Sequence, residues 1–131
     1  MAICNSKIVI TDGPLPLPPI DWKDSAGGIV DFWGVVRRLE NGEEISGIEY
    51  EAHQPMAQHQ MEKIASQART EFELQEIILR HRIGFVAAGE ASLFLRVASA
   101  HRKTAFRASQ WIVAELKQKV PIWKRPLFVT R

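Results

Sequence analysis

The stretch from Pro55 to Phe72 constrains the fold of this chain more than any other. Apolar residues recur through it at helical spacing between Gln, Glu, Lys and Arg, at Ala57, Met61, Ile64, Ala65, Ala68 and Phe72. Pro55 is well placed as the first residue of the helix. An amphipathic helix of this kind buries its apolar face, and the short strand-like segments on both sides of it can supply a sheet for that purpose.

The remaining elements follow from alternation and turn residues. Strands are expected at residues 7–11, 29–37, 45–52, 76–83 and 92–98. Gly34 indicates a bulge, residues 40–43 form a hairpin turn, and residues 84–90 are expected to be a loop in an antiparallel hairpin. A second helix is predicted at 102–119, with Ser99 as its N-cap and Pro121 as its end. The order β-β-β-α-β-β-α predicts an α+β fold with a mainly antiparallel sheet.

Prolines dominate the segment 13–19, GPLPLPP. Their density excludes a helix or a central strand, so we expect an extended connection, followed by one turn of helix at 21–25. The 131 residues are expected to form a single domain. Within it, residues 1–26 are the N-terminal strand and proline-rich connection, 27–125 the core of the domain, and 126–131 a short tail.

The charge of the chain is nearly balanced. It has 17 Lys and Arg against 15 Asp and Glu, a net charge of +2, which argues against nonspecific coating of nucleic acid. From Arg96 to Arg131, however, Glu115 is the only carboxylate among many basic residues. A local cationic pocket is therefore expected. The single Cys4, the lack of a signal peptide pattern and the lack of a long apolar run favour a cytoplasmic protein.

Basic residues gather at the predicted start of the second helix. His101, Arg102 and Lys103 follow Ser99 almost directly, where each exposed cation opposes the helix macrodipole by about 0.3–1 kcal/mol. Free backbone N–H groups at that end already favour an anion. Two interpretations remain open: three solvated surface charges, or a site for a phosphate or carboxylate.

Two further lysines lie on either side of Pro121. Lys117 projects about 70° from the centre of the apolar stripe, whereas Lys119 points well away from it, so Lys117 is the better pocket residue. Lys124 follows Trp123, whose ring is expected to shield one flank. A desolvated lysine near other cations is a better nucleophile, because its neutral form is favoured. The alternative is a lysine that only counters the helix dipole.

Other site patterns are missing from the sequence. It has no glycine-rich phosphate loop, cysteine metal site or serine elbow motif, and so no metal and no cofactor are expected. His53 and His59 have no partner at metal-ligand spacing and are interpreted as structural. Trp111 is expected on the exposed face of the second helix, a modest indication of a protein interface. Residue types alone predict an α+β domain that binds an anion.

Six motifs taken together resemble one protein family. They are FWGVVR (32–37), GIEYEAHQPMA (47–57), HRIG (81–84), GEAS (89–92), SAHR (99–102) and LKQKVPIWK (116–124). On these motifs the chain, from residue 28 to 125, closely resembles the large, catalytic subunit of molybdopterin synthase. The resemblance implies an α/β-hammerhead-like domain with an antiparallel sheet, two main helices and a small additional antiparallel β subdomain.

The resemblance also implies an enzyme, a sulfurtransferase of molybdenum cofactor biosynthesis. That family converts cyclic pyranopterin monophosphate to molybdopterin, taking two sulfurs from the C-terminal Gly-Gly thiocarboxylate of a small ubiquitin-like partner subunit. Its large subunits form a homodimer, and a small subunit at each end completes a heterotetramer. No metal, further cofactor, nucleic acid or membrane is implied.

Site residues are carried over by motif. Lys117 and Lys124 match the two catalytic lysines at which the partner's tail meets the substrate. Arg37, His101 and Arg102 match an anion pocket for the substrate phosphate, partly shared across the dimer, and an aromatic residue that lines the site is matched by Phe32. This match gives the cations at the helix start a reason, because a bound phosphate neutralises them.

Two alternatives and one departure accompany this interpretation. The chain could be a non-catalytic module that captures a partner's C-terminal carboxylate in the same cationic pocket, which does not require both lysines. Nucleic-acid binding by the basic C-terminal third lacks the charge excess and the interleaved exposed aromatics. Many family members carry an acidic residue and a longer tail after the PIWK motif, where this chain reads RPLFVTR. We expect Leu127 and Phe128 to contact the partner by a different route.

Overall fold

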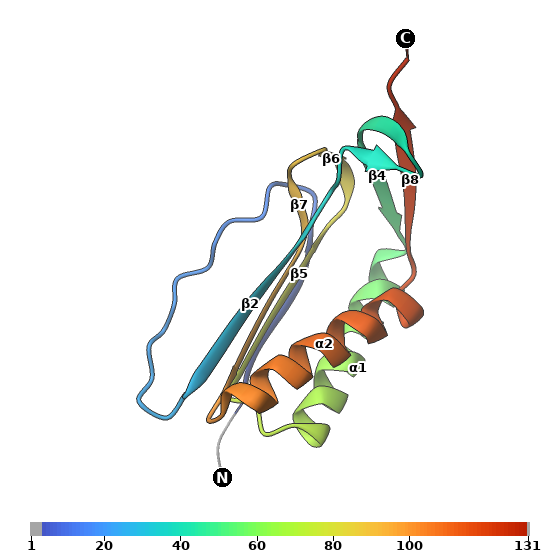
Figure 1. Cartoon of the computed structure of the whole chain (residues 1–131). Helices are drawn as coiled ribbons and strands as arrows, with labels where there is room; N and C mark the ends of the chain where they lie inside the picture. The colour runs from blue at the N-terminus through green and yellow to red at the C-terminus, as the bar shows by residue number, and fades with distance from the viewer. Residues whose placement is uncertain (1–3, 131) are drawn as a thin grey trace.

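The computed structural model of the chain describes residues 4–130; the ends of the predicted domain, residues 1–3 and 131, lie outside the described residues. Two helices and two sheets make up the described part (Figure 1). Its elements in chain order are β1 Asn5–Thr11, β2 Gly28–Val35, β3 Leu39–Glu40, β4 Glu43–Ala52, α1 Gln54–Glu71, β5 Glu76–Arg82, β6 Gly84–Ala87, β7 Ala91–Ser99, α2 Arg102–Lys119 and β8 Ile122–Phe128.

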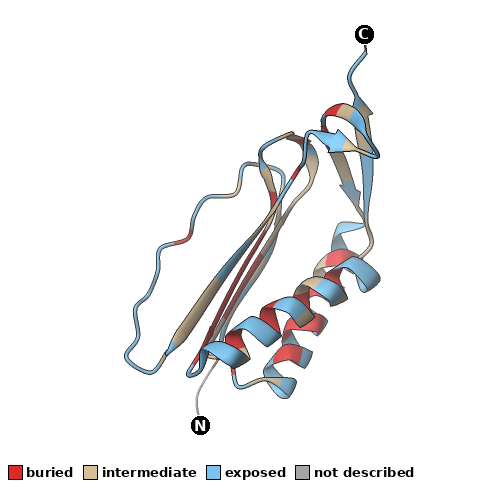
Figure 2. Cartoon of the chain, in the orientation of Figure 1, coloured by how far each residue is buried: buried red, intermediate tan, exposed pale blue. Residues whose placement is uncertain are grey.

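The first sheet has the strand order β1-β5-β7-β2. β1 runs parallel to β5, and the other neighbours are antiparallel, so the predicted α+β class with a mainly antiparallel sheet is confirmed. Both helices cover one face of this sheet, and their buried sides face it (Figure 2). The main core between them consists of Met61, Ile64, Ala65, Ala68, Leu74, Ile77, Leu79, Leu95, Val97, Ala105, Ala108, Ile112 and Leu116.

The two helices begin in different ways. His53 caps α1, because its Nδ1 accepts a hydrogen bond from the Met56 backbone N–H at 3.3 Å, which confirms a structural role for this histidine. α2 spans the predicted residues, but its N-cap is His101, which makes no side-chain capping bond. The prediction of Ser99 as the cap was wrong. Ser99 ends β7 in the core, and its hydroxyl donates to the carbonyl oxygen of Glu73 at 2.9 Å.

The proline-rich connection covers the face of the first sheet that the helices leave open (Figure 1). Residues 12–27 contain no helix or strand, as predicted for 13–19. Pro18 is buried, and the carbonyl oxygen of Pro19 accepts a hydrogen bond from the buried Arg96 at 2.9 Å. The helical turn predicted at 21–25 was wrong, because a single bond from Ala26 N–H to the Lys23 carbonyl closes only a turn.

The second sheet is built around β4. This strand pairs antiparallel with β6 and β8, and at its start with the two-residue β3. Its core is small and consists of Val36, Ile45, Ile48 and Val86, with Tyr50 partly buried beside them. Residues 84–90 were predicted to be a loop, which was wrong for β6. Gly84 has a φ of 85°, a conformation that lets the chain leave the first sheet and enter the second.

The predicted turn and bulge are present, but the strands around them pair differently than expected. The hairpin turn at Asn41 and Gly42 is confirmed by their positive φ values of 51° and 82°, and a register shift next to Gly34 confirms the predicted bulge. However, β2 pairs with β7 rather than with the strand that returns from this turn. Within the predicted tail, residues 126–128 belong to β8, which ends at Phe128 and is an edge strand on β4.

Candidate active site

Lys117 and Lys124 lie where the first layer of the molecule, which consists of the first sheet and its two helices, meets the second layer, which is the second sheet. Lys117 is in the last turn of α2, which packs on the first sheet, and Lys124 is on β8 of the second sheet. Only Val120 and Pro121 separate α2 from β8, so the last turn of α2 and the start of β8 lie at the same end of the domain (Figure 1). Both residues are exposed.

The prediction that the ring of Trp123 shields Lys124 was wrong. Adjacent residues of a strand point to opposite faces, and Trp123 pairs with Glu51 on the outer face of the second sheet, where it is 61% exposed. Lys124 instead pairs with Tyr50 and shares a face with Ile48, which is buried in the small core of the second sheet. The stem of Lys124 therefore starts on the inner face of this sheet.

Arg37 and Phe32 come from β2 and the residues after it. Val36 is anchored by backbone bonds with Gly89 and Glu90, and the exposed Arg37 follows it at the end of the domain that carries the second sheet. Phe32 pairs with Leu95 and so lies on the helix side of the sheet, 39% exposed. Its ring extends over Gly34, because a Cβ at that position would be 3.8 Å from it.

His101 and Arg102 lie at the opposite end of the domain. The Cα of Arg102 is 2.8 Å from where a Cβ on Gly28 would be, so the start of α2 is held against the start of β2. From Arg102 to Lys117 α2 rises about 22 Å, and from Gly28 to Arg37 an extended chain covers about 30 Å. One copy of the chain therefore does not bring His101 and Arg102 together with Arg37 and the lysines.

The five basic residues predicted for the site are not neutralised by other side chains within residues 4–130. Within residues 4–130, none of Arg37, His101, Arg102, Lys117 and Lys124 has an ion pair or a side-chain hydrogen bond. Lys119 is exposed, as expected from its direction on the helix, and it forms an ion pair with Glu115 at 2.7 Å. The first turn of α2 has no acidic residue, and so its N–H groups and basic side chains are available to an anion.

A polar pair next to Lys124 was missed by the sequence reasoning. The Tyr50 hydroxyl donates to Ser92 Oγ at 3.3 Å, and the ring of Tyr50 meets that of His81 edge-on, with centroids 5.4 Å apart. Burial lowers the pKa of His81 below its ordinary value of 6.5, although Nδ1 bonds to the Arg82 carbonyl oxygen. Trp111, predicted to be exposed, is partly buried against Phe72.

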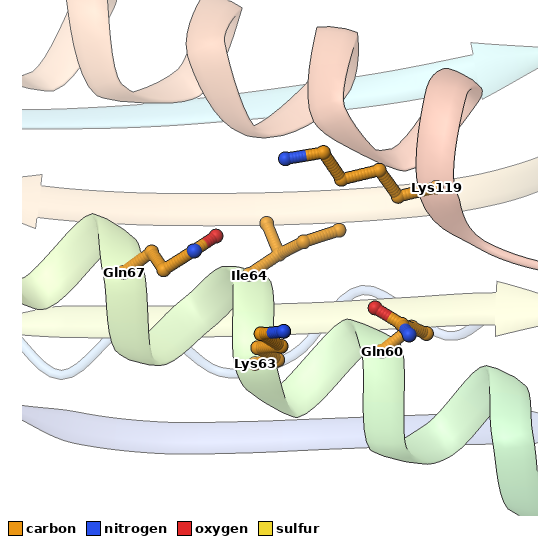
Figure 3. A pocket seen from close by; sticks show the side chains of 5 residues that line it. All are labelled: Gln60, Lys63, Ile64, Gln67 and Lys119. Atoms are coloured by element: carbon orange, nitrogen blue, oxygen red, sulfur yellow. The ribbon is translucent and has the colours of Figure 1, made fainter.

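A cavity of about 320 Å³ lies between α1 and α2 and contains none of the six predicted site residues. It is lined by Gln60, Lys63, Ile64 and Gln67 of α1 and by Lys119 of α2 (Figure 3). Among residues 4–130 no three His, Cys, Asp or Glu side chains are grouped so that they could hold a metal ion. Neither helix in that range has the length and apolarity to cross a membrane.

Comparison with known proteins relates this chain to one family. Residues 12–119 match the family model described as MoaE protein. A "Molybdopterin synthase catalytic subunit" of Thermoplasma volcanium is 36% identical over 126 residues, which cover 94% of this chain and 92% of that protein. The crystal structure of molybdopterin synthase from Staphylococcus aureus has a TM-score of 0.85 at 28% identity, over 93% of this chain and 91% of that one.

A further solved structure shares the fold. It is the complex of subunits 1 and 2 of the molybdopterin-converting factor from Helicobacter pylori, with a TM-score of 0.65 at 21% identity. The alignment covers 82% of this chain and 74% of that one.

Proposed function

This chain belongs to the MoaE family, and on that premise we propose how its residues carry out the reaction of a molybdopterin synthase catalytic subunit. It is a sulfurtransferase of molybdenum cofactor biosynthesis. Its substrate is cyclic pyranopterin monophosphate, and its sulfur donor is a small ubiquitin-like partner subunit with a C-terminal Gly-Gly thiocarboxylate. The product is molybdopterin, and the reaction takes place in the cytoplasm.

The observation that carries the site assignment is the pair of unpaired lysines at the junction of the two layers. Lys117 and Lys124 are exposed, have no ion-pair partner within residues 4–130, and come from different layers of the domain. An extended peptide tail with a negative end that reaches this junction meets both ammonium groups. Lys117 and Lys124 are therefore the catalytic residues of the proposal, and Phe32 and Arg37 line the substrate side.

His101 and Arg102 reach the site from a second copy of the chain. β2 is an edge strand of the first sheet, so its outer side is open to another strand. A two-fold related copy that pairs antiparallel with β2 lays the start of one β2 beside the end of the other. The Arg102 end of each copy then approaches the Arg37 end of its neighbour. Exposed apolar side chains on this side, Phe32, Val35 and Phe106, suit such a contact.

Sulfur transfer then follows from the positions of these groups. Arg37, with His101 and Arg102 of the second copy, holds the substrate phosphate. The thiocarboxylate sulfur bonds to a substrate carbon as an oxygen substituent leaves, and Lys117 and Lys124 stabilise the negative charge or move the proton. Water then adds to the acyl carbon, its bond to sulfur breaks, and the partner leaves with an ordinary carboxylate. A second partner repeats the step at the adjacent carbon, which completes the dithiolene.

Incubation of the purified chain with thiocarboxylated partner subunit and cyclic pyranopterin monophosphate tests this function. Mass spectrometry of the pterin is expected to show the dithiolene product, and Lys117→Ala is expected to abolish it. Normal product formation by Lys117→Ala would refute the lysine assignment. If the chain bound the partner's tail without forming product, the non-catalytic capture of a carboxylate would be the better description.

A further inference from the structure

Tyr50 occupies a special place beside Lys124. In the register of the second sheet it lies opposite Lys124 on β8 and opposite Gly84 on β6. Side chains directly opposite each other in an antiparallel pair leave the same face, with Cβ atoms about 4.5–5.5 Å apart. Glycine supplies no side chain on the other flank. The ring of Tyr50 is therefore the side chain directly opposite Lys124 on the same face of the sheet.

The first sheet holds this ring from two directions. Ser92 on β7 accepts the hydrogen bond from the Tyr50 hydroxyl, and His81 on β5 meets the edge of the ring at an interplanar angle of 73°. Ser92 is 7% exposed, so the hydroxyl is fixed at a buried point. Tyr50 belongs to the second sheet by its backbone, but its side chain is anchored to the first.

The second sheet has the smaller of the two buried cores. Its buried core has only four members, Val36, Ile45, Ile48 and Val86, whereas the core under the helices has thirteen. Lys117 is carried by α2 on the larger core, and Lys124 by β8 on the smaller one. The spacing of the two lysines therefore depends on how firmly the smaller sheet is held.

We propose that Tyr50 is a positioning residue for Lys124: its ring, anchored by Ser92 and His81, holds Lys124 at the distance from Lys117 that sulfur transfer requires. This inference rests on the proposed function of the two lysines. Tyr50 itself does not touch the reacting atoms, and it acts through Lys124. A displacement of about 1 Å at a catalytic group can lower a rate by about 100-fold, so loss of this anchor is measurable.

Two substitutions at Tyr50 separate the ring from the hydroxyl. We expect Tyr50→Leu, which removes the ring, to lower kcat for dithiolene formation at least about 10-fold with little change in the KM for the thiocarboxylated partner. Tyr50→Phe keeps the ring against His81 and is expected to lower kcat by only about threefold, through loss of the hydrogen bond to Ser92. Phe72→Leu, which removes a ring packed on Trp111 in the helix layer, is the matched control for reduced stability and is expected to keep wild-type kcat.

The decisive measurement repeats both Tyr50 substitutions in a Lys124→Ala background. If Tyr50 acts through Lys124, neither substitution lowers the residual rate further. Equal losses in both backgrounds, or wild-type kcat in Tyr50→Leu, would overturn the proposal while the lysine assignment stands. If Tyr50→Leu does not fold, Tyr50→Phe and Ser92→Ala decide the question, because both remove the same anchor and the double variant should be no worse than either. If the wild-type chain forms no dithiolene at all, the proposed function itself fails, and this inference with it.

Discussion

The guanidinium of Arg96 is completely buried and makes two hydrogen bonds to the carboxylate of Asp31, at 2.7 and 2.8 Å. The two residues are cross-strand partners on β7 and β2, on the face opposite the helices. The third bond of Arg96, to the Pro19 carbonyl oxygen, fastens the proline-rich connection to the sheet. Its bond to Asp31 raises the pKa of Arg96 above its already high ordinary value, so the charge is permanent.

Removal of Asp31 and removal of Arg96 are expected to lower the free energy of unfolding by different amounts. Asp31→Ala leaves a permanent charge buried without its counter-ion and is expected to lower the free energy of unfolding by about 3–5 kcal/mol. Arg96→Met removes that charge, and the Asp31 side chain, which is 24% exposed, can turn to water. We therefore expect the smaller loss for Arg96→Met. Urea unfolding of both variants gives the comparison, and the reverse order would contradict the role of the buried charge.

His81 is expected to make the folded chain sensitive to acid. Burial lowers its pKa in the folded state, so below pH 6.5 the unfolded chain binds a proton that the folded chain resists. Stability is unaffected by this group above that pH and falls as the pH drops below it, by at most about 1.4 kcal/mol per pH unit. We expect His81→Gln to remove this part of the pH dependence between pH 7 and 5.

Unfolding free energies of wild type and His81→Gln, measured across that pH range, test the prediction. The exposed His59 offers a matched control for the substitution itself, because His59→Gln makes the same change outside the core. Parallel curves for wild type and His81→Gln would show that this ring is protonated equally well in both states.

Local patterns predicted the helices better than the second sheet. The span of α2 followed from apolar spacing and Pro121, because helical bonds are local. β6 has four residues, and β8 contains Pro126, which is tolerated because β8 is an edge strand. Both strands are defined by pairing with β4, and such nonlocal pairing leaves little trace in either segment alone.

The candidate site shows the same difference between what local patterns predict and what depends on nonlocal pairing. The motifs predicted Lys117, Lys124 and Arg37 as site residues, but their placement at one end of the domain, with Arg102 at the other, required the fold. Tyr50 was overlooked because it occupies an ordinary alternating position in a strand. Its relation to Lys124 exists only through the β4–β8 register, and β8 was not predicted.

Substitutions of the neighbouring Arg37 and Arg38 test the proposed phosphate site. Arg37→Gln is expected to weaken binding of the pyranopterin monophosphate by about 10- to 150-fold, because a hydrogen bond between charged groups contributes about 1.5–3 kcal/mol. Arg38→Gln changes the next exposed residue in the same way and is expected to bind normally. Titration calorimetry with the substrate measures both. Equal weakening in the two variants would indicate a diffuse surface potential rather than a phosphate contact at Arg37.

Complementation between two inactive variants tests whether the site is shared between copies. In the proposed dimer, each site combines Lys117 of one copy with Arg102 of the other. A mixed dimer of Lys117→Ala and Arg102→Ala then contains one doubly damaged site and one intact site. Random mixing makes about half of the dimers mixed, so about a quarter of wild-type activity should return.

The two variants are unfolded and refolded together, and each is also treated alone as the control. Recovery in the mixture, with none in either control, requires that Arg102 reach the lysines of another copy. No recovery, in mixtures that native mass spectrometry shows to contain mixed dimers, would mean that His101 and Arg102 act elsewhere. Because the roughly 22 Å rise of α2 keeps Arg102 away from Lys117 of its own chain, that outcome would count against the dimer formed through β2.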